Sequence, residues 1–281
     1  MNFKLVAMSL FIGLVAAVSC NSQNSNTTTN TNKDSAAPTT FAIKEEPVTY
    51  SAGGKIFNGY VIYDSNQVGK RPAVLVVHEW WGLTDYPRSR AKQLAELGYI
   101  AMAVDMYGDG KTAADPKEAQ ALATPYYKDP TLAKTRLDAA INTLKTFPQT
   151  DTSKMAAIGY CYGGFIVLNA AKLGADIKGV VSFHGDLSGV PVNKDLLKAK
   201  VLVCHGEADQ FVTKEAVNSF KKSMDSAGVA YTFKAYPDAT HAFTNPGATE
   251  LGKKFNMPIK YNAAADTASW NDMKTFFAKI F

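Results

Sequence analysis

The chain has 281 residues, 46% of them hydrophobic, which is enough for one large domain with a full core. Its formal net charge of +5 is mild and its lysines are interspersed with acidic residues, so the composition does not favour a nucleic-acid-binding surface. The three cysteines include no C-x-x-C pair, which argues against a thioredoxin-like redox protein.

Residues 1–19 have the pattern of a signal peptide. Lys4 precedes an apolar run, residues 5–18, that is short for a membrane span and ends in small residues before Cys20. A cysteine at this point resembles a bacterial lipoprotein signal, and the resemblance implies cleavage before Cys20 and lipid on its sulfur and amine. An ordinary secretory signal that is cut nearby is the alternative.

Residues 20–40 have a composition that cannot form a core. They are mostly Asn, Thr, Ser and Gln, so we expect the lipidated cysteine to be followed by a disordered tether. Together the two segments predict an exported protein of the bacterial cell envelope, which meets the membrane only through a lipid anchor at Cys20.

Hydrophobic patterning predicts one folded domain over residues 41–281. Two β-like runs, 41–50 and 56–63, flank a glycine pair and predict an antiparallel hairpin. After the hairpin, apolar strands alternate with helical patterns. The expected strands are 73–77, 99–104, 154–158, 177–183, 201–204 and 231–236, and the expected helices are 86–97, one that begins near 115, 130–145, 165–173, 214–226 and 263–280.

This order of elements predicts an α/β protein. It favours a mostly parallel, eight-stranded sheet with helices on both faces. Ligands of such sheets bind beyond the carboxyl ends of the strands. Reactive side chains that directly follow the expected strands are therefore the candidates for a functional site.

The most informative motif is Gly159-x-Cys161-x-Gly163, which follows the expected strand 154–158. A strand, a sharp turn and a helix with a nucleophile at the tip form the G-x-S-x-G nucleophile elbow, here with sulfur in place of oxygen. The glycines let the chain pass closely, and the Tyr162 N–H at the helix start can face an anion beside the sulfur. A buried structural cysteine in a tight turn is the alternative.

A cysteine nucleophile needs a base, and His241 is placed to supply it. In the α/β-hydrolase order the nucleophile comes first, the acid second and the histidine last. Only His241 lies late enough in the chain, after the last expected strand. His184 and His205 lie at earlier strand ends, where His184 is a candidate pocket residue and His205 most simply caps its strand.

The acid of the triad is expected in the loop after the strand 201–204. That loop contains Glu207 and Asp209, and Asp209 is favoured because an apolar pair follows it and can bury it. Asp186 and Asp238 are the alternatives. The closeness of Asp238 to the histidine in sequence does not decide between them, because sequence distance does not set triad geometry.

Five segments, in this order, resemble the dienelactone hydrolase family from about residue 45 to the C-terminus. They are His78-Glu79-Trp80-Trp81-Gly82, Asp105-Met106-Tyr107, Gly159-Tyr160-Cys161-Tyr162-Gly163-Gly164, His205-Gly206-Glu207-Ala208-Asp209 and His241-Ala242-Phe243. The resemblance implies an α/β-hydrolase fold and a catalytic triad of Cys161, Asp209 and His241. It also implies that the Glu79 carboxylate lies near the resting thiol and that the N–H groups of Trp80 and Tyr162 form the oxyanion hole.

The chain departs from this family at two places where the resemblance leads us to expect arginines that hold a substrate carboxylate. The first place reads Gly108-Asp109-Gly110 and the second reads Thr244-Asn245-Pro246. Neither supplies a guanidinium, the group best suited to a bidentate carboxylate, and the nearest cation is Lys111. Dienelactone itself is therefore not the expected substrate.

Aromatic residues in the strand-end loops favour an apolar or aromatic acyl pocket instead. The candidates for this pocket are Trp80, Trp81, Tyr107, Tyr160, Tyr162 and Phe243, with His184 as a polar contact.

The sequence thus favours a cysteine hydrolase that cleaves an ester or lactone through a thioester acyl-enzyme. A carboxylesterase or thioesterase of unrelated substrate, and a binding lipoprotein whose site has decayed, are the alternatives. We expect no cofactor and no metal site, a monomer, and a small ester or lactone as the only ligand. Cys204, inside an apolar strand, is expected to be a buried hydrophobic residue.

Overall fold

The structure is a computed structural model that describes residues 40–281, and these residues form one compact unit. The predictions for the signal peptide, for Cys20 and for nearly all of the tether lie outside the described residues. Within residues 40–281, no helix has the length and apolar character needed to cross a membrane.

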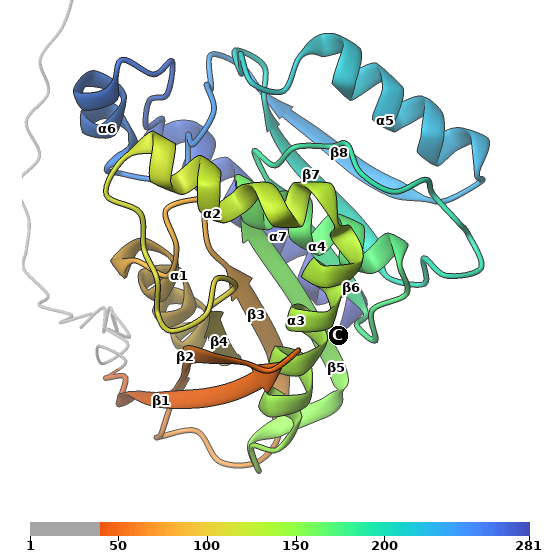
Figure 1. The fold of residues 1–281 in the computed structure, drawn as a ribbon. Coiled ribbons are helices and arrows are strands. Elements are labelled where there is room, and N and C mark those ends of the chain that lie inside the picture. The colour runs from red at the N-terminus through yellow and green to blue at the C-terminus, as the bar shows by residue number, and fades with distance from the viewer. Residues whose placement is uncertain (1–39) are drawn as a thin grey trace, which may run out of the picture. The chain divides into compact units, whose positions relative to one another are not determined.

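An eight-stranded sheet lies at the centre of this unit (Figure 1). Its strands follow the spatial order β1-β2-β4-β3-β5-β6-β7-β8. The β1–β2 and β2–β4 pairs are antiparallel, and every other neighbouring pair is parallel. The strands are β1 (Ile43–Ala52), β2 (Lys55–Asp64), β3 (Arg71–Val77), β4 (Ile100–Val104), β5 (Thr150–Tyr160), β6 (Gly179–Phe183), β7 (Lys200–Gly206) and β8 (Tyr231–Tyr236).

Helices cover both faces of the sheet, and each face has its own apolar core. One core contains buried residues of α2 (Pro116–Lys128), α3 (Pro130–Lys145), α4 (Tyr162–Lys172) and α5 (Lys214–Ser226). The other contains buried residues of α1 (Asp85–Glu96) and α7 (Ala263–Ile280). Figure 1 shows α2 and α3 in front of the sheet and α7 behind it. This is the α/β-hydrolase fold, so the predicted fold class is confirmed.

Two features of the fold differ from the expected elements. Strand β5 begins at Thr150, four residues before the expected start, because Thr150 already pairs with Arg71 of β3; the register then shifts before pairing resumes at Met155. Helix α6 (Ala248–Phe255) was not expected. It has only eight residues, and its N-cap residue is Gly247, which has no side chain to cap it, so it lacks the usual start signal of a helix.

The turn between β5 and α4 brings three stretches of backbone into close contact. Cys161 lies at its tip with φ 53° and ψ −114°, a conformation that side-chain-bearing residues rarely adopt. A Cβ atom on Gly159 would lie 2.0 Å from the Gly163 carbonyl oxygen, and one on Gly163 would lie 2.3 Å from the Val77 carbonyl oxygen. Both positions therefore require glycine, and the turn is held against the end of β3.

These contacts predict a large loss of stability for Gly159→Ala. The added methyl group overlaps backbone that cannot move aside, so we expect a loss of at least about 3 kcal/mol in the free energy of unfolding, measured by urea denaturation. Gly53→Ala is the matched control: Gly53 has φ +57°, but a Cβ atom added there would meet nothing within 4 Å, so strain alone should cost about 1–2 kcal/mol. Equal losses for the two variants would contradict the steric account.

Candidate active site

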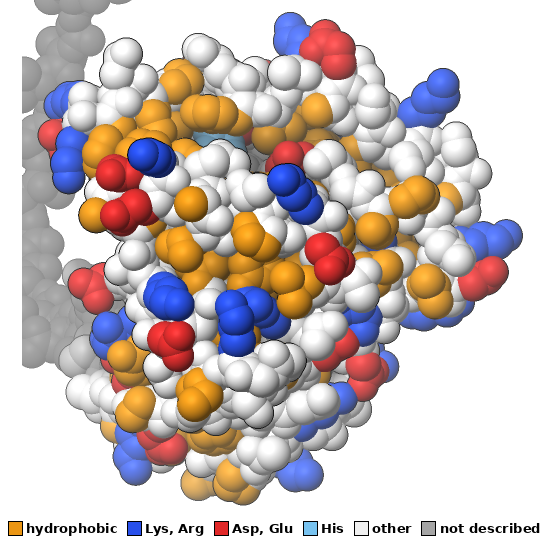
Figure 2. All heavy atoms as spheres, viewed as in Figure 1, with side chains coloured by type: hydrophobic (Ala, Val, Ile, Leu, Met, Phe, Trp, Pro, Cys, Tyr) orange, Lys and Arg blue, Asp and Glu red, His pale blue; other side chains and the backbone are white. Residues whose placement is uncertain are grey.

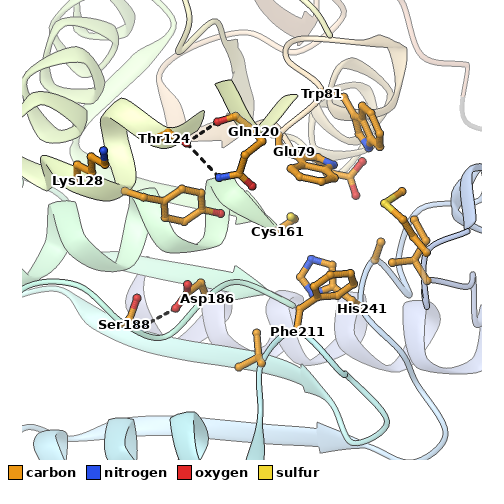
Figure 3. Close-up of a pocket in the computed structure, with 16 residues that line it drawn as sticks. Glu79, Trp81, Gln120, Thr124, Lys128, Cys161, Asp186, Ser188, Phe211 and His241 are labelled. Atoms are coloured by element: carbon orange, nitrogen blue, oxygen red, sulfur yellow. Dashed lines mark hydrogen bonds between the residues drawn. The ribbon is translucent and has the colours of Figure 1, made fainter. Parts of the chain in front are cut away.

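A cavity of about 570 Å³ opens at the carboxyl ends of the parallel strands. Figure 2 shows a hollow on this face with hydrophobic side chains around it and a histidine visible inside. Figure 3 shows Cys161, His241 and Glu79 facing this cavity. Its lining residues are Glu79, Trp80, Trp81, Gln120, Thr124, Tyr127, Lys128, Cys161, Asp186, Ser188, Phe211, Val212, His241, Ala242, Met257 and Ile259.

Three strand-end segments bring the expected triad residues together. Cys161 follows β5, Asp209 follows β7 and His241 follows β8. The Nδ1 atom of His241 lies 2.9 Å from Asp209 Oδ2, and the other side of the ring faces the Cys161 thiol. Because a carboxylate only accepts, Nδ1 carries the proton and Nε2 is left to accept one. This is the order and geometry of a nucleophile, a base and a group that orients the base.

The charges of this cluster favour the protonated form of His241. Burial acts to lower the pKa of His241, but the negative charge of Cys161 and the hydrogen bond to Asp209 outweigh it and raise that pKa well above its usual value. Burial likewise acts to raise the pKa of Asp209, yet the hydrogen bond and charge of His241 lower it. The arrangement can therefore take a proton from the thiol and hold it on the imidazole.

The alternative acids lie elsewhere. Glu207 and Asp238 are exposed, and Asp186 lines the cavity, where its carboxylate accepts a hydrogen bond from the Ser188 N–H. Asp209 is buried and accepts N–H bonds from the two residues of the apolar pair that follows it, at 2.8 and 3.0 Å. The same loop therefore buries the carboxylate and orients it.

Glu79 is a buried carboxyl group on the cavity wall. Its Oε2 accepts a hydrogen bond of 2.7 Å from Asn245 Nδ2. Burial raises the pKa of Glu79 to about 7, although Asn245 and the charges of His241 and Arg90 act to lower it. Glu79 is thus close to half-protonated at neutral pH.

The peptide between Glu79 and Trp80, in the loop after β3, is held by hydrogen bonds to its carbonyl oxygen. The Glu79 carbonyl oxygen accepts bonds from His78 Nδ1 at 2.5 Å and from the Gly82 N–H at 3.2 Å. In a trans peptide the C=O and the N–H point in opposite directions. The Trp80 N–H therefore points away from His78 Nδ1 and the Gly82 N–H, which both bond to the Glu79 carbonyl oxygen. Within residues 40–281, the N–H groups of Trp80 and Tyr162 donate to no protein acceptor. Both donors are therefore free for an oxyanion.

His78 is held as a neutral ring in this arrangement. It is fully buried, and burial lowers its pKa to about 4. Its Nε2 accepts the Met106 N–H at 3.2 Å, so the proton lies on Nδ1, which donates to the carbonyl of Glu79. The Tyr107 hydroxyl fixes the next peptide by donating to the Trp80 carbonyl oxygen at 2.9 Å.

Five of the expected pocket residues do not line the cavity. Tyr107, His184 and Phe243 are buried and do not line the cavity, whereas Trp80 and Trp81 do. Tyr160 and Tyr162 are also fully buried outside the cavity lining. These side chains face the sheet and its cores, because strand-end residues alternate between the site and the interior.

His184 links Cys161 to the loop that carries His241. Its Nδ1 accepts the Cys161 N–H at 3.1 Å, and its Nε2 lies 2.7 Å from Thr244 Oγ1. Burial holds the pKa of His184 well below its usual value, so the ring is neutral and Nε2 donates to the hydroxyl. His184 therefore supports the site from below instead of contacting a ligand.

Sequence reasoning missed the residues that α2 contributes to the cavity. They are Gln120, Thr124, Tyr127 and Lys128. Their separations of three, four and seven residues could have indicated this, because such separations place side chains on one face of a helix. It also missed the bond between Asn245 and Glu79, which joins residues 166 positions apart. Among the described residues, no group of three or more His, Cys, Asp or Glu side chains is arranged to hold a metal ion.

Comparisons with known proteins agree on one family. Residues 57–281 match the model of the "Dienelactone hydrolase family". "Protein usf" of Aquifex pyrophilus is 29% identical over 218 residues, which span 73% of this chain and 87% of that protein.

Two solved structures are similar over nearly their whole length. A "Dienelactone Hydrolase-like Promiscuous" phosphotriesterase, P91, from metagenomic libraries is 33% identical, with a TM-score of 0.79 over 85% of this chain and 99% of that one. A structure named "m3DLH" is 34% identical, with a TM-score of 0.80 and the same coverage.

The raised pKa of Glu79 predicts a pH-dependent effect of Glu79→Gln. The native carboxyl holds its proton up to about pH 7, whereas the unfolded one loses it near its ordinary value of 4.5. Its stabilising contribution is therefore complete at low pH and is lost as pH rises through 7. Between pH 5 and 8, the free energy of unfolding of Glu79→Gln should gain about 2 to 3 kcal/mol relative to the unsubstituted protein.

Urea denaturation at several pH values measures this difference. Glu250→Gln, at an exposed position on α6, is the matched control and should follow the unsubstituted protein. If the free energy of unfolding of Glu79→Gln changes with pH in the same way as that of the unsubstituted protein from pH 5 to 8, the buried carboxyl does not titrate as described.

Proposed function

Because the chain belongs to the dienelactone hydrolase family, we propose that this hydrolase uses Cys161 as its nucleophile and cleaves an ester or lactone through a thioester. The observation that carries the proposal is the bond between His241 Nδ1 and Asp209 Oδ2, with the Cys161 thiol on the other side of the ring. The strained turn at Cys161 and the two free N–H groups beside it complete the set of parts that acyl transfer needs.

The first half of the reaction transfers the acyl group to sulfur. His241 Nε2 accepts the thiol proton, and the sulfur electron pair attacks the carbonyl carbon. The carbonyl oxygen becomes an oxyanion that receives the N–H groups of Trp80 and Tyr162. The intermediate then collapses to the thioester, the C–O bond breaks, and His241 returns the proton to the departing alkoxide. Asp209 keeps the ring in the tautomer that this sequence requires.

The second half hydrolyses the thioester. His241 Nε2 takes a proton from water, and the resulting hydroxide attacks the thioester carbonyl in the same oxyanion hole. The C–S bond breaks, the carboxylic acid leaves, and the thiolate recovers its proton from His241. Glu79, which lines the same cavity, is proposed to lie near the resting thiol and to limit its ionisation until substrate enters.

The residues at the expected arginine positions argue against dienelactone itself as the substrate. Asn245 donates to Glu79 from the second of these positions, and an amide carries no positive charge for a substrate carboxylate. A carboxylic ester or thioester without a carboxylate at this point is the class we favour. The similarity to P91, a promiscuous phosphotriesterase, adds phosphotriesters as a further class worth assaying.

A decayed binding protein is disfavoured by the same geometry. Loss of function leaves no constraint on a strained backbone, yet Cys161 has a positive φ that its neighbours hold in place. The triad hydrogen bond and the two free N–H donors would serve no purpose in a site that only binds.

For location we propose, from the sequence alone, that Cys20 is lipidated and anchors the protein in the bacterial cell envelope. The expected result is that the full-length chain sediments with membranes and releases with detergent, and that Cys20→Ser moves it to the soluble fraction. Unchanged membrane association of Cys20→Ser would contradict lipidation at this residue.

The proposed nucleophile predicts a large and selective kinetic loss. Cys161→Ala should lower kcat/KM on p-nitrophenyl esters by at least about 10³-fold, because no other group can form the acyl-enzyme. Cys204→Ala is the matched control. Cys204 is buried and does not line the cavity, so its loss should leave kcat/KM within about threefold. Retained turnover in Cys161→Ala would contradict the mechanism.

A further inference from the structure

The cavity has two chemically different ends. Figure 3 shows Thr124, Lys128, Asp186 and Ser188 on one side of Cys161 and Trp81 on the other. We call the first the polar end, and it consists of Gln120, Thr124, Tyr127, Lys128, Asp186 and Ser188. The apolar end consists of Trp81, Phe211, Met257 and Ile259.

The two ends correspond to the two halves of a bound ester. His241 must reach the leaving group to protonate it, so the leaving group lies on the histidine side of the thiol. The centroid of the Phe211 ring lies 5.1 Å from that of His241, and Ile259 forms a β-bridge with His241, so two residues of the apolar end lie beside the histidine. The polar end lies across Cys161 from His241 and therefore faces the acyl group (Figure 3).

Several polar groups at the polar end are bonded to one another. Gln120 Nε2 donates to Thr124 Oγ1 at 3.0 Å, and that hydroxyl donates to the Gln120 carbonyl oxygen at 2.6 Å. The Ser188 N–H donates to Asp186 Oδ1 at 2.7 Å. Lys128 and Asp186 carry opposite charges, so the polar end as a whole favours neither an anion nor a cation.

The Tyr127 hydroxyl faces the cavity without such a bond. Among the described residues it has no hydrogen-bond partner, although the side chain is half-buried at the cavity. Burial raises the pKa of Tyr127 well above its usual value, so the group is a neutral donor. The hydroxyl is accessible from the cavity, where it can donate to a ligand.

The ring of Tyr127 is fixed relative to the nucleophile. Its centroid lies 4.7 Å from that of Phe165 and 5.8 Å from that of Tyr162, and both partners belong to the first turn of α4, directly after Cys161. The preceding residue, Tyr126, differs from Tyr127 in both respects. Its hydroxyl donates to the Met106 carbonyl oxygen at 2.6 Å, and its side chain does not line the cavity. Tyr127 is thus placed to bond with a substrate.

We infer that the Tyr127 hydroxyl selects the acyl group of the substrate by donating a hydrogen bond to an uncharged oxygen on it. The substrates are then esters of oxo, hydroxy or ether acids rather than plain alkanoates. This inference rests on the proposed function, because it assumes that an acyl group is transferred to Cys161.

Matched pairs of p-nitrophenyl esters test the inference. Pentanoate is compared with 4-oxopentanoate, and hexanoate with 5-oxohexanoate. Each enzymatic kcat/KM is divided by the rate constant for alkaline hydrolysis of the same ester, which corrects for differences in intrinsic reactivity. The full-length protein should prefer at least one oxo ester, and Tyr127→Phe should lower that preference in kcat/KM about tenfold. Tyr126→Phe should keep the preference. A ratio within one variant cancels any loss of folded enzyme.

The outcomes separate the inference from the function. Turnover of both esters with no oxo preference, or with a preference that Tyr127→Phe leaves unchanged, overturns the role of Tyr127 and leaves the hydrolase intact. No turnover of any ester by folded protein contradicts the proposed function, and the inference falls with it.

Discussion

The close approach of three backbone segments at the tip of β5 is the constraint on which the site depends. Gly159 and Gly163 lie against each other, and Gly163 lies against the end of β3. Since no side chain fits between them, Cys161 is lifted out of the sheet with a positive φ, and its thiol has the cavity on its open side. The same contact places the start of α4, with the Tyr162 N–H, against the end of β3, which leads into the loop that carries Trp80.

Two neutral, buried histidines hold the loops that meet at this point. His78 bonds the loop after β3 to the loop after β4, through Glu79 and Met106. His184 bonds the nucleophile turn to the loop that carries His241, through Thr244. Each uses one ring nitrogen as donor and the other as acceptor, so protonation would break one bond in each pair, and burial opposes that protonation. The site thus has rigid supports beneath a cavity whose walls come from α2 and the segment after α6.

The sequence predicted the sheet, most helices and the grouping of Cys161, Asp209 and His241, because these depend on local signals. Apolar runs define buried strands, and the order of strand-end residues in a parallel sheet determines which of them meet. Pocket assignment could not be read this way. Whether Tyr107 or Phe243 faces the cavity depends on how a loop turns after its strand. Hydrogen bonds to side chains set that turn. In the loop after β4, the Asp105 carboxylate accepts N–H bonds from Tyr107, Gly108 and Gly110. The contribution of α2 depends on how the helix docks, which periodicity alone does not give.

The central claim is that Cys161 becomes acylated during turnover, and mass spectrometry tests it most directly. The protein is mixed with an activated ester, quenched in acid within milliseconds, and measured intact and after proteolysis. The account predicts one added acyl mass on the peptide that contains Cys161, its formation before the steady state, and its disappearance when substrate is exhausted. Turnover with no acyl mass on any residue, or with the acyl mass on a residue other than Cys161, would contradict it.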